Sequence, residues 1–160
     1  TTHNRTTLSH QLNQLDHSTE RLGVRGIWRL PSEAEWEYLS RANTTTRWAF
    51  GDRDGDLSDY GWHAGNSGAS TREVGQKKAN PWGFLDLHGQ VSEWCEDTFV
   101  ANYESHEGIQ SPKQGDSLRR IHRGGSWFTE SDSTRCSSRG SALTNHQSDG
   151  IGFRLVWQPV

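Results

Sequence analysis

Glycine, asparagine, aspartate and serine interrupt every apolar run that follows Ala42. Because these residues favour turns and weaken regular structure, no segment of helical length remains in that part of the chain. We therefore expect loops and short strands there, and we expect the polar segments 98–114 and 129–150 to be loops. The expected strands are 91–95, 120–123, 126–128, 134–138 and 152–157.

Helical patterns occur only before this region. Leucines at positions 8, 12, 15 and 22 fit one apolar face, so the pattern predicts an amphipathic helix over 8–22. Ser32 follows a proline and precedes Glu35 by three residues, which is a capping-box pattern and predicts a helix over 33–41. In this second helix we expect Trp36 and Leu39 to face the core, with Ala34 and Tyr38 beside them.

Composition places the core in aromatic rather than aliphatic side chains. Only 30% of the 160 residues are apolar, yet 8 are Trp, 5 Phe and 3 Tyr. This length suits one domain and is too short for two. No stretch approaches the roughly 20 apolar residues that span a bilayer, so we expect no membrane insertion. The net charge is -3 and the basic residues are scattered, which argues against a nucleic-acid partner.

The two cysteines, Cys95 and Cys136, are too few for a disulfide framework or a zinc cage. They could pair once or stay reduced. The sequence opens on Thr1 without a methionine, so we expect a processed product or a piece of a longer protein. The localisation stays open: a signal could precede residue 1, as it would in a secreted or surface-displayed protein.

Four blocks of sequence carry a family resemblance when they are taken in order. They are Arg29–Tyr38, His88–Thr98, Arg123–Trp127 and Gly152–Val156. The chain resembles the formylglycine-generating enzyme (sulfatase-modifying factor) family from about Leu12 to Val156. The resemblance implies a loop-rich α+β domain with a C-type lectin-like fold, two helices near the start and a small twisted antiparallel sheet. It also implies that residues 1–160 are a single domain that lacks the N-terminal part of the family.

The same resemblance implies a calcium site at Gln90 and Glu93, because amide and carboxylate oxygens are hard ligands that suit this ion. Gln90 stands where the family usually has asparagine, which moves the amide oxygen by one methylene. Ser92 likewise stands where the family usually has tryptophan. The alternative is that Gln90 and Glu93 satisfy buried backbone groups in a loop-rich core.

The cysteines decide the enzymatic interpretation. Oxidases of this family bind copper through two thiols a few residues after the Arg-Gly-Gly-Ser block, since soft thiolates select monovalent copper. In this chain the stretch 127–135 contains no cysteine, so we expect no copper and no oxidase activity of that kind. An oxidoreductase or accessory enzyme with an unrecognised site remains the alternative function.

The leading hypothesis is a non-enzymatic ligand-binding domain. Segment 128–149 mixes aromatic, aliphatic and hydrogen-bonding side chains, as antibody paratopes do, and resembles the variable segment of proteins diversified by retroelements. We expect it to recognise a protein or another macromolecule. The candidate ligand-binding residues are Trp127, Phe128, Glu130, Asp132, Ser138, Leu143, Asn145, His146 and Asp149. A structural domain whose polar loops bind nothing is the third possibility.

The motifs also contain four arginines, Arg123, Arg135, Arg139 and Arg154. Arginine offers five donors in a fixed geometry, and a loop-rich core contains many irregular backbone acceptors. We therefore expect these arginines to hold loop carbonyls rather than to form an anion site.

Overall fold

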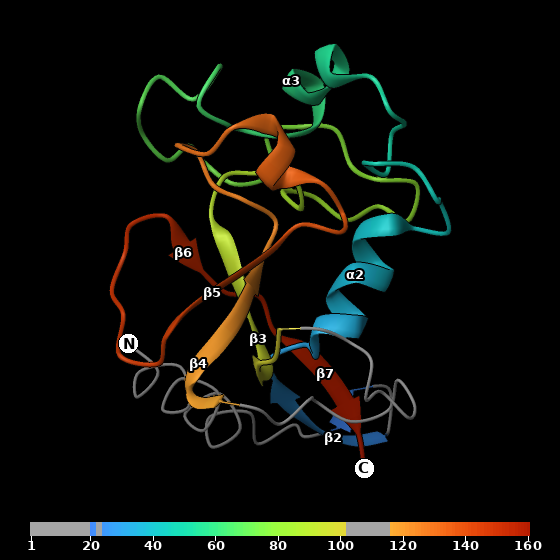
Figure 1. Ribbon diagram of the computed structural model, residues 1–160. Coiled ribbons are helices and arrows are strands. Elements are labelled where there is room, and N and C mark those ends of the chain that lie inside the picture. Colours follow the sequence, from blue (N-terminus) through green and yellow to red (C-terminus); the bar gives the residue numbers. More distant parts are fainter. Residues whose placement is uncertain (1–19, 22–23, 102–115) are drawn as a thin grey trace.

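The computed structural model describes residues 20–21, 24–101 and 116–160, and these form an α+β fold (Figure 1). The strands are β1 (Glu20–Arg21), β2 (Val24–Arg29), β3 (Ser92–Phe99), β4 (Asp116–Arg123), β5 (Arg139–Leu143), β6 (Ile151–Gly152) and β7 (Val156–Pro159). The helices are α2 (Glu33–Arg41) and α3 (Leu57–Tyr60), with 3-10 turns η1 (Asp54–Asp56) and η2 (Ser131–Thr134). Every helix in these ranges is too short to cross a bilayer.

The helix expected over 8–22 lies outside the described residues except near its end. There the prediction was wrong, because Glu20 and Arg21 form β1 and pair with Arg25 and Val24 of β2. Strand β2 then pairs with β7 in antiparallel fashion, with Trp28 opposite Trp157. A three-stranded sheet, β1-β2-β7, therefore joins segments from the two ends of the described chain (Figure 1).

The second sheet has the order β5-β4-β3-β6. Strands β3, β4 and β5 are antiparallel, as expected, whereas the short β6 runs parallel to β3. Three of the five predicted strands overlap strands of the structure, at 91–95, 120–123 and 152–157.

The strands predicted at 126–128 and 134–138 were wrong, since both segments are turns. Thr129 N–H donates to Ser126 O over 3.0 Å and closes the first turn. Ser138 N–H donates to Arg135 O over 3.0 Å and closes the second. Segment 129–150 is correspondingly less irregular than expected, because it contains η2 and β5.

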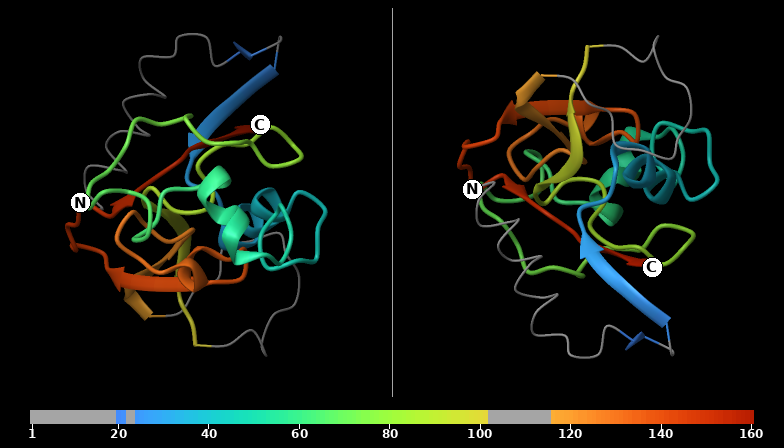
Figure 2. Two further views of the ribbon diagram at one scale, coloured as in Figure 1. Left: turned by 90° about the horizontal axis from the view of Figure 1, so that it is seen from above. Right: turned by 90° about the horizontal axis from the view of Figure 1, so that it is seen from below.

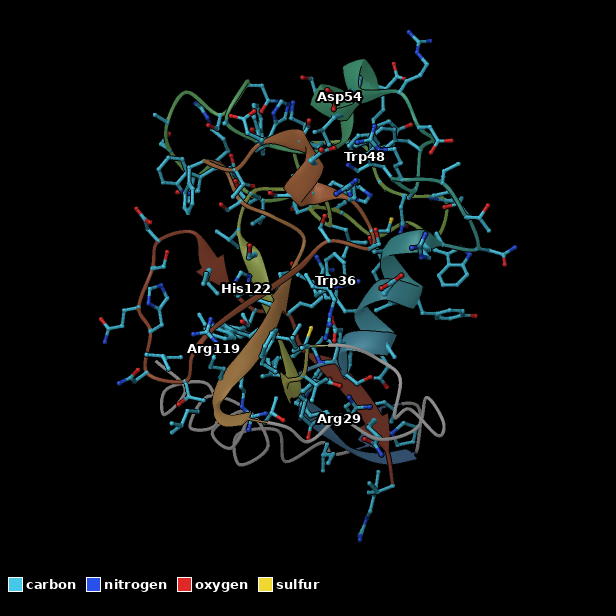
Figure 3. All side chains as sticks on the ribbon, viewed as in Figure 1. Arg29, Trp36, Trp48, Asp54, Arg119 and His122 are labelled. Carbon is cyan, nitrogen blue, oxygen red and sulfur yellow. The ribbon has the colours of Figure 1, made fainter. Side chains whose placement is uncertain are left out.

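Helix α2 has the predicted bounds and the predicted capping box. Glu35 N–H donates to Ser32 Oγ over 3.2 Å, and Ser32 N–H donates back to the Glu35 carboxylate over 2.8 Å. Trp36 is fully buried and points toward the four-stranded sheet (Figure 3). Tyr38 was placed wrongly: it is 65% exposed, and its ring packs edge-on against Trp82 at the surface.

The interior combines aromatic and aliphatic side chains, so the expectation of an aromatic core is met in part: Trp36, Trp48 and Trp94 are buried, and so are Leu57, Leu87 and Ile121. Trp36 packs with Leu87, Cys95 and Ile121 in the main core cluster. A second group stacks Phe50 between Trp48, at 5.6 Å, and Tyr60, at 4.3 Å. The four-residue helix α3, which was not predicted, contributes the fully buried Leu57.

A buried network of charges joins α2 to β4 and β5. The Glu33 carboxylate, 4% exposed, accepts two hydrogen bonds from Arg139 and one from Arg123. Arg123 is 1% exposed, also pairs with Glu37, and donates to Cys136 O over 2.6 Å. The expectation that arginines hold loop carbonyls is therefore met at Arg123, but the acidic partners on α2 were not predicted.

Candidate ligand-binding site

Segment 128–149 is held by its backbone at points spread along its length. The anchoring bonds are Trp127 N–H to Gln90 O (2.9 Å), Ala64 N–H to Thr129 O (3.0 Å), Cys136 N–H to Arg47 O (2.9 Å) and Thr144 N–H to Leu118 O (2.8 Å). The two ends of the segment also meet, because the Phe128 ring lies on Gly150: a Cβ added there would be 2.2 Å from Phe128 Cε1. The side chains can therefore differ without changing the bonds that hold the backbone.

Most of the predicted ligand-binding side chains are exposed. Phe128 is 50% and Leu143 47% exposed, although both are large and apolar. The exposed polar members are Glu130, Asp132, Asn145, His146 and Asp149. Trp127 and Ser138 are half-buried, and the Trp127 indole meets the Phe128 ring edge-on at 5.0 Å. The surface thus offers two separate apolar side chains among hydrogen-bonding groups.

A cavity of about 400 Å³ lies where this segment meets β4. It is lined by Ser92, His122, Arg123, Gly124, Gly125, Thr129, Asp132, Ser133, Arg135, Ser138, Arg139 and Gly140. Of the predicted ligand-binding residues, only Asp132 and Ser138 line it. Viewed from above, η2 and the start of β5 lie on the same side of the molecule (Figure 2). The sequence analysis missed the other lining residues for two reasons. It assigned the arginines among them to structural roles, and the small residues among them carry no chemical signature.

Asp132 connects the groups at the rim of the cavity. Its backbone carbonyl accepts a hydrogen bond from Ser138 Oγ at 2.6 Å and another from Arg135 Nε at 2.9 Å. Its carboxylate forms an ion pair with Arg47, and Arg135 Nη1 lies 3.9 Å from the same carboxylate. The rim therefore contains two guanidinium groups and one carboxylate.

His122, on β4, forms one wall of the cavity with Arg119 nearby on the same strand (Figure 3). The imidazole packs edge-on against Trp94 and lies against Gly140, where a Cβ would be 2.2 Å from its ring. Burial lowers the pKa of His122 to about 4, helped by the positive charges of His146 and Arg119. The ring is therefore neutral at neutral pH and offers both a donor and an acceptor.

The glycines that follow β4 let the loop approach η2 closely. Gly124 and Gly125 have φ of 95° and 70°, which favours glycine. A Cβ on Gly125 would lie 2.9 Å from Ser133 O. The two glycines thus set the floor of the cavity against η2.

His88 fixes the far side of η2. A carbonyl can only accept, so His88 Nδ1–H donates to Thr134 O over 2.9 Å and Nε2 is left to accept from Ala49 N–H at 3.4 Å. Trp48 Nε1–H donates to the hydroxyl of the same threonine over 2.9 Å. Burial lowers the pKa of His88 to about 4, so the neutral tautomer is the stable form.

Gln90 and Glu93, the residues implied for calcium, have their oxygens engaged with protein groups. The Glu93 carboxylate accepts from Arg154 at 2.6 and 2.8 Å and from Trp36 Nε1–H at 2.7 Å. The Gln90 amide oxygen accepts from Arg72 N–H over 3.0 Å, and its nitrogen donates to Arg72 O. As they lie, these side chains do not fit a calcium ion, which needs six to eight oxygen ligands. Calcium binding there stays a prediction that requires new partners for both side chains.

Cys95 and Cys136 are both buried and unpaired. Ser40 Oγ–H donates to Cys136 Sγ over 3.3 Å. Burial raises the pKa of both thiols, so the thiolate form that binds soft metals is disfavoured. Within the described ranges, no group of three or more His, Cys, Asp or Glu side chains is arranged to hold a metal ion.

This combination of a capped helix, a small curved antiparallel sheet and long anchored loops defines the C-type lectin-like class of folds. Residues 7–159 match the sulfatase-modifying factor enzyme 1-like domain. The chain therefore belongs to the formylglycine-generating enzyme (FGE-sulfatase) family, which confirms the resemblance seen in the sequence.

The relatives of the chain have diverse names. Variable protein 1 of Treponema denticola is 34% identical with a TM-score of 0.76, covering 81% of this chain and 47% of its own. The formylglycine-generating enzyme of Mycobacterium tuberculosis is 31% identical over 82% of this chain and 52% of its own length. The serine/threonine-protein kinase pkn1 of Chlamydia caviae is 35% identical over 80% of this chain. The chain spans 21% of that kinase and about half of the other two.

Proposed function

We propose that this domain is a non-enzymatic binding module that recognises a protein or another macromolecule through segment 128–149. The observation that carries the proposal is the half-exposure of Phe128 and Leu143 among exposed polar side chains. Large apolar side chains that are surrounded by adaptable hydrogen-bonding groups are typical of binding surfaces. Their backbone is anchored, so ordering the loop on binding would cost little free energy.

The same arrangement supports a diversified version of this function. Substitutions of exposed side chains away from special backbone positions usually change stability by less than about 0.5 kcal/mol. The exposed side chains of the segment could therefore vary while the pairing of β5 with β4 and the position of α2 stay constant. Similarity to variable protein 1 of Treponema denticola favours this version. Sequences of the locus from several isolates test it: changes concentrated in 127–149 are expected, and a uniform segment would sink it.

Binding itself is tested with a double variant, Phe128→Ala with Leu143→Ala. A partner held by the wild type should be lost by the double variant, while its thermal unfolding stays within a few degrees of the wild type. The control is Val74→Ala, because Val74 is an apolar residue that is 74% exposed and outside the segment. Equal loss of partner binding in the control and in the double variant would count against the proposed surface.

The second candidate is an oxidoreductase or accessory enzyme of the same family. Identity of 31% with the Mycobacterium tuberculosis formylglycine-generating enzyme over 82% of this chain favours it. The raised thiol pKa values of Cys95 and Cys136 speak for the binding function instead. Oxygen consumption with thiol peptides, with and without added copper, separates the two candidates, and turnover that is lost in Cys136→Ser would favour the enzyme.

A further inference from the structure

Arg123, which lines the cavity under segment 128–149, has a buried donor that finds no acceptor in the described part of the chain. Arg123 lines the cavity and is 1% exposed, and its two terminal nitrogens are bonded to carboxylates and carbonyls. Its Nε–H has no hydrogen-bond partner among residues 20–21, 24–101 and 116–160. A buried donor whose hydrogen bond is not made destabilises the fold by roughly 1–3 kcal/mol. Buried donors in native proteins therefore nearly always meet an acceptor. A ligand oxygen would have to displace the cavity wall to reach this donor, because the Arg123 side chain is 0% exposed.

A second cation at the cavity is oriented and open. Arg135 Nε–H donates to the backbone carbonyl of Asp132 at 2.9 Å, which fixes the plane of the guanidinium group. Its side chain is 38% exposed, and no hydrogen bond from its terminal nitrogens is seen among residues 24–101 and 116–160. A guanidinium group that presents two parallel N–H donors matches a carboxylate in geometry.

The charge around the cavity favours a single negative charge. At the rim, the carboxylate of Asp132 is shared between Arg47 and Arg135, which leaves one positive charge in excess. The arginines behind the rim are already matched by acidic side chains of α2. His122 is neutral, and Arg119 is not among the lining residues, because its guanidinium group donates to Ser141. A dianionic phosphate would bring more charge than this rim balances, and it would face Asp132.

We propose that this cavity binds a carboxylate group of the ligand, with Arg135 as its charged anchor. The proposal rests on the binding function proposed above, because it assigns a chemistry to one subsite of the same face. A volume of about 400 Å³ falls within the range of ordinary ligand pockets and holds an acidic side chain or a chain terminus with its neighbours. Phe128 and Leu143 lie outside the cavity lining, so they would contact the remainder of the ligand.

The test is an NMR titration of the isotope-labelled protein with three small probes. N-acetylglycine carries a terminal carboxylate, N-acetylglutamate α-amide carries a side-chain carboxylate, and N-acetylglycinamide is neutral. We expect saturable shifts at the Arg135 Nε–H and His122 signals with one or both carboxylates, with a Kd on the order of millimolar for so few atoms. The neutral amide should cause none, and the preferred carboxylate distinguishes a chain terminus from an acidic side chain.

Variants make the assignment specific. Arg135→Gln should weaken carboxylate binding roughly tenfold or more, since it removes a charge-assisted pair. The matched control is Arg53→Gln, the same change at an arginine whose side chain is 84% exposed and outside the cavity lining. It should leave the Kd unchanged.

Three results would overturn the proposal: no saturable shift with either carboxylate, equal binding of the neutral amide, or equal weakening by the two variants. The binding function can survive such a failure. In that case, a partner would still depend on Phe128 and Leu143 but would be indifferent to Arg135→Gln. Conversely, the protein could bind the carboxylate probes while partner binding does not depend on Phe128 and Leu143. That result would refute the proposed binding surface and support the carboxylate pocket.

Discussion

Replacing Glu33 with glutamine should destabilise the fold more than any other removal of one charge described above. The Glu33 carboxylate is 4% exposed and accepts hydrogen bonds at 2.6 and 2.8 Å from Arg139 and at 3.1 Å from Arg123. Glutamine keeps one acceptor oxygen but turns an NH2 group toward one guanidinium group. Arg123 would keep Glu37 as a partner, and that carboxylate is already shared with Arg41.

The size of the effect follows from this geometry. Removing one partner from a buried ion pair costs about 3–5 kcal/mol, because a charge is left buried without compensation. Arg123 keeps its bonds to Glu37 and Cys136 O, so we take the lower end, about 3 kcal/mol. At roughly 2–4 °C per kcal/mol for a domain of this size, the melting temperature should fall by about 10 °C.

Urea unfolding followed by tryptophan fluorescence measures this difference. The midpoint should fall with little change in slope, since the folded state keeps its surface. The control is Glu73→Gln, at an exposed carboxylate with one hydrogen bond, from Gln76, which should change stability by no more than about 0.5 kcal/mol. A fall in the free energy of unfolding of less than about 1 kcal/mol for Glu33→Gln would refute the reasoning that the buried arginines need the charge of Glu33.

Three further outcomes are expected. Because burial lowers the pKa of His88 to about 4, the unfolded chain takes up this proton first, and this histidine alone should lower the free energy of unfolding by about 3 kcal/mol between pH 6.5 and 4, with a further fall from His122, whose pKa is also about 4. Urea titrations at both pH values should show a smaller fall in His88→Asn; an unchanged fall would rule out this histidine as the cause. Gly125→Ala should cost about 1–3 kcal/mol through its positive φ and the 2.9 Å approach to Ser133 O, whereas Gly55→Ala, with open space around it, should be nearly neutral in thermal melts. Millimolar calcium should leave the melting temperature unchanged, since Arg154 occupies the Glu93 carboxylate, and a rise would show that this carboxylate changes partners.

Local signals in the sequence predicted local structure well. The capping box of Ser32 and Glu35 gave the start of α2, because its hydrogen bonds are made within four residues. The motif blocks predicted the family and fold, and the match over residues 7–159 confirms both. Strand ends were predicted less well: the turn at 134–138 and β5 at 139–143 contain similar small polar residues, and only pairing with β4 distinguishes them.

The candidate site was the part that the sequence predicted least. The nine residues that the sequence predicts to bind a ligand lie on or beside an anchored segment, but the cavity depends on contacts between distant segments. Arg123 is separated from Glu33 by 90 positions, and His122 meets Gly140 across a strand pair. Such contacts carry no periodicity along the chain, so Arg135 looked like another structural arginine. Its open terminal nitrogens are apparent only in three dimensions.

The contact between Phe128 and Gly150 has a consequence for how this protein could change over time. Because the two ends of the segment touch, everything between them leaves and returns to one spot on the scaffold. Insertions or deletions in the loops of the segment would leave the distance between Phe128 and Gly150 the same. Evolution, or an engineer, could therefore exchange the exposed loops of the stretch, provided that position 150 stays glycine and that β5, Cys136 and Arg139 keep their contacts with the scaffold.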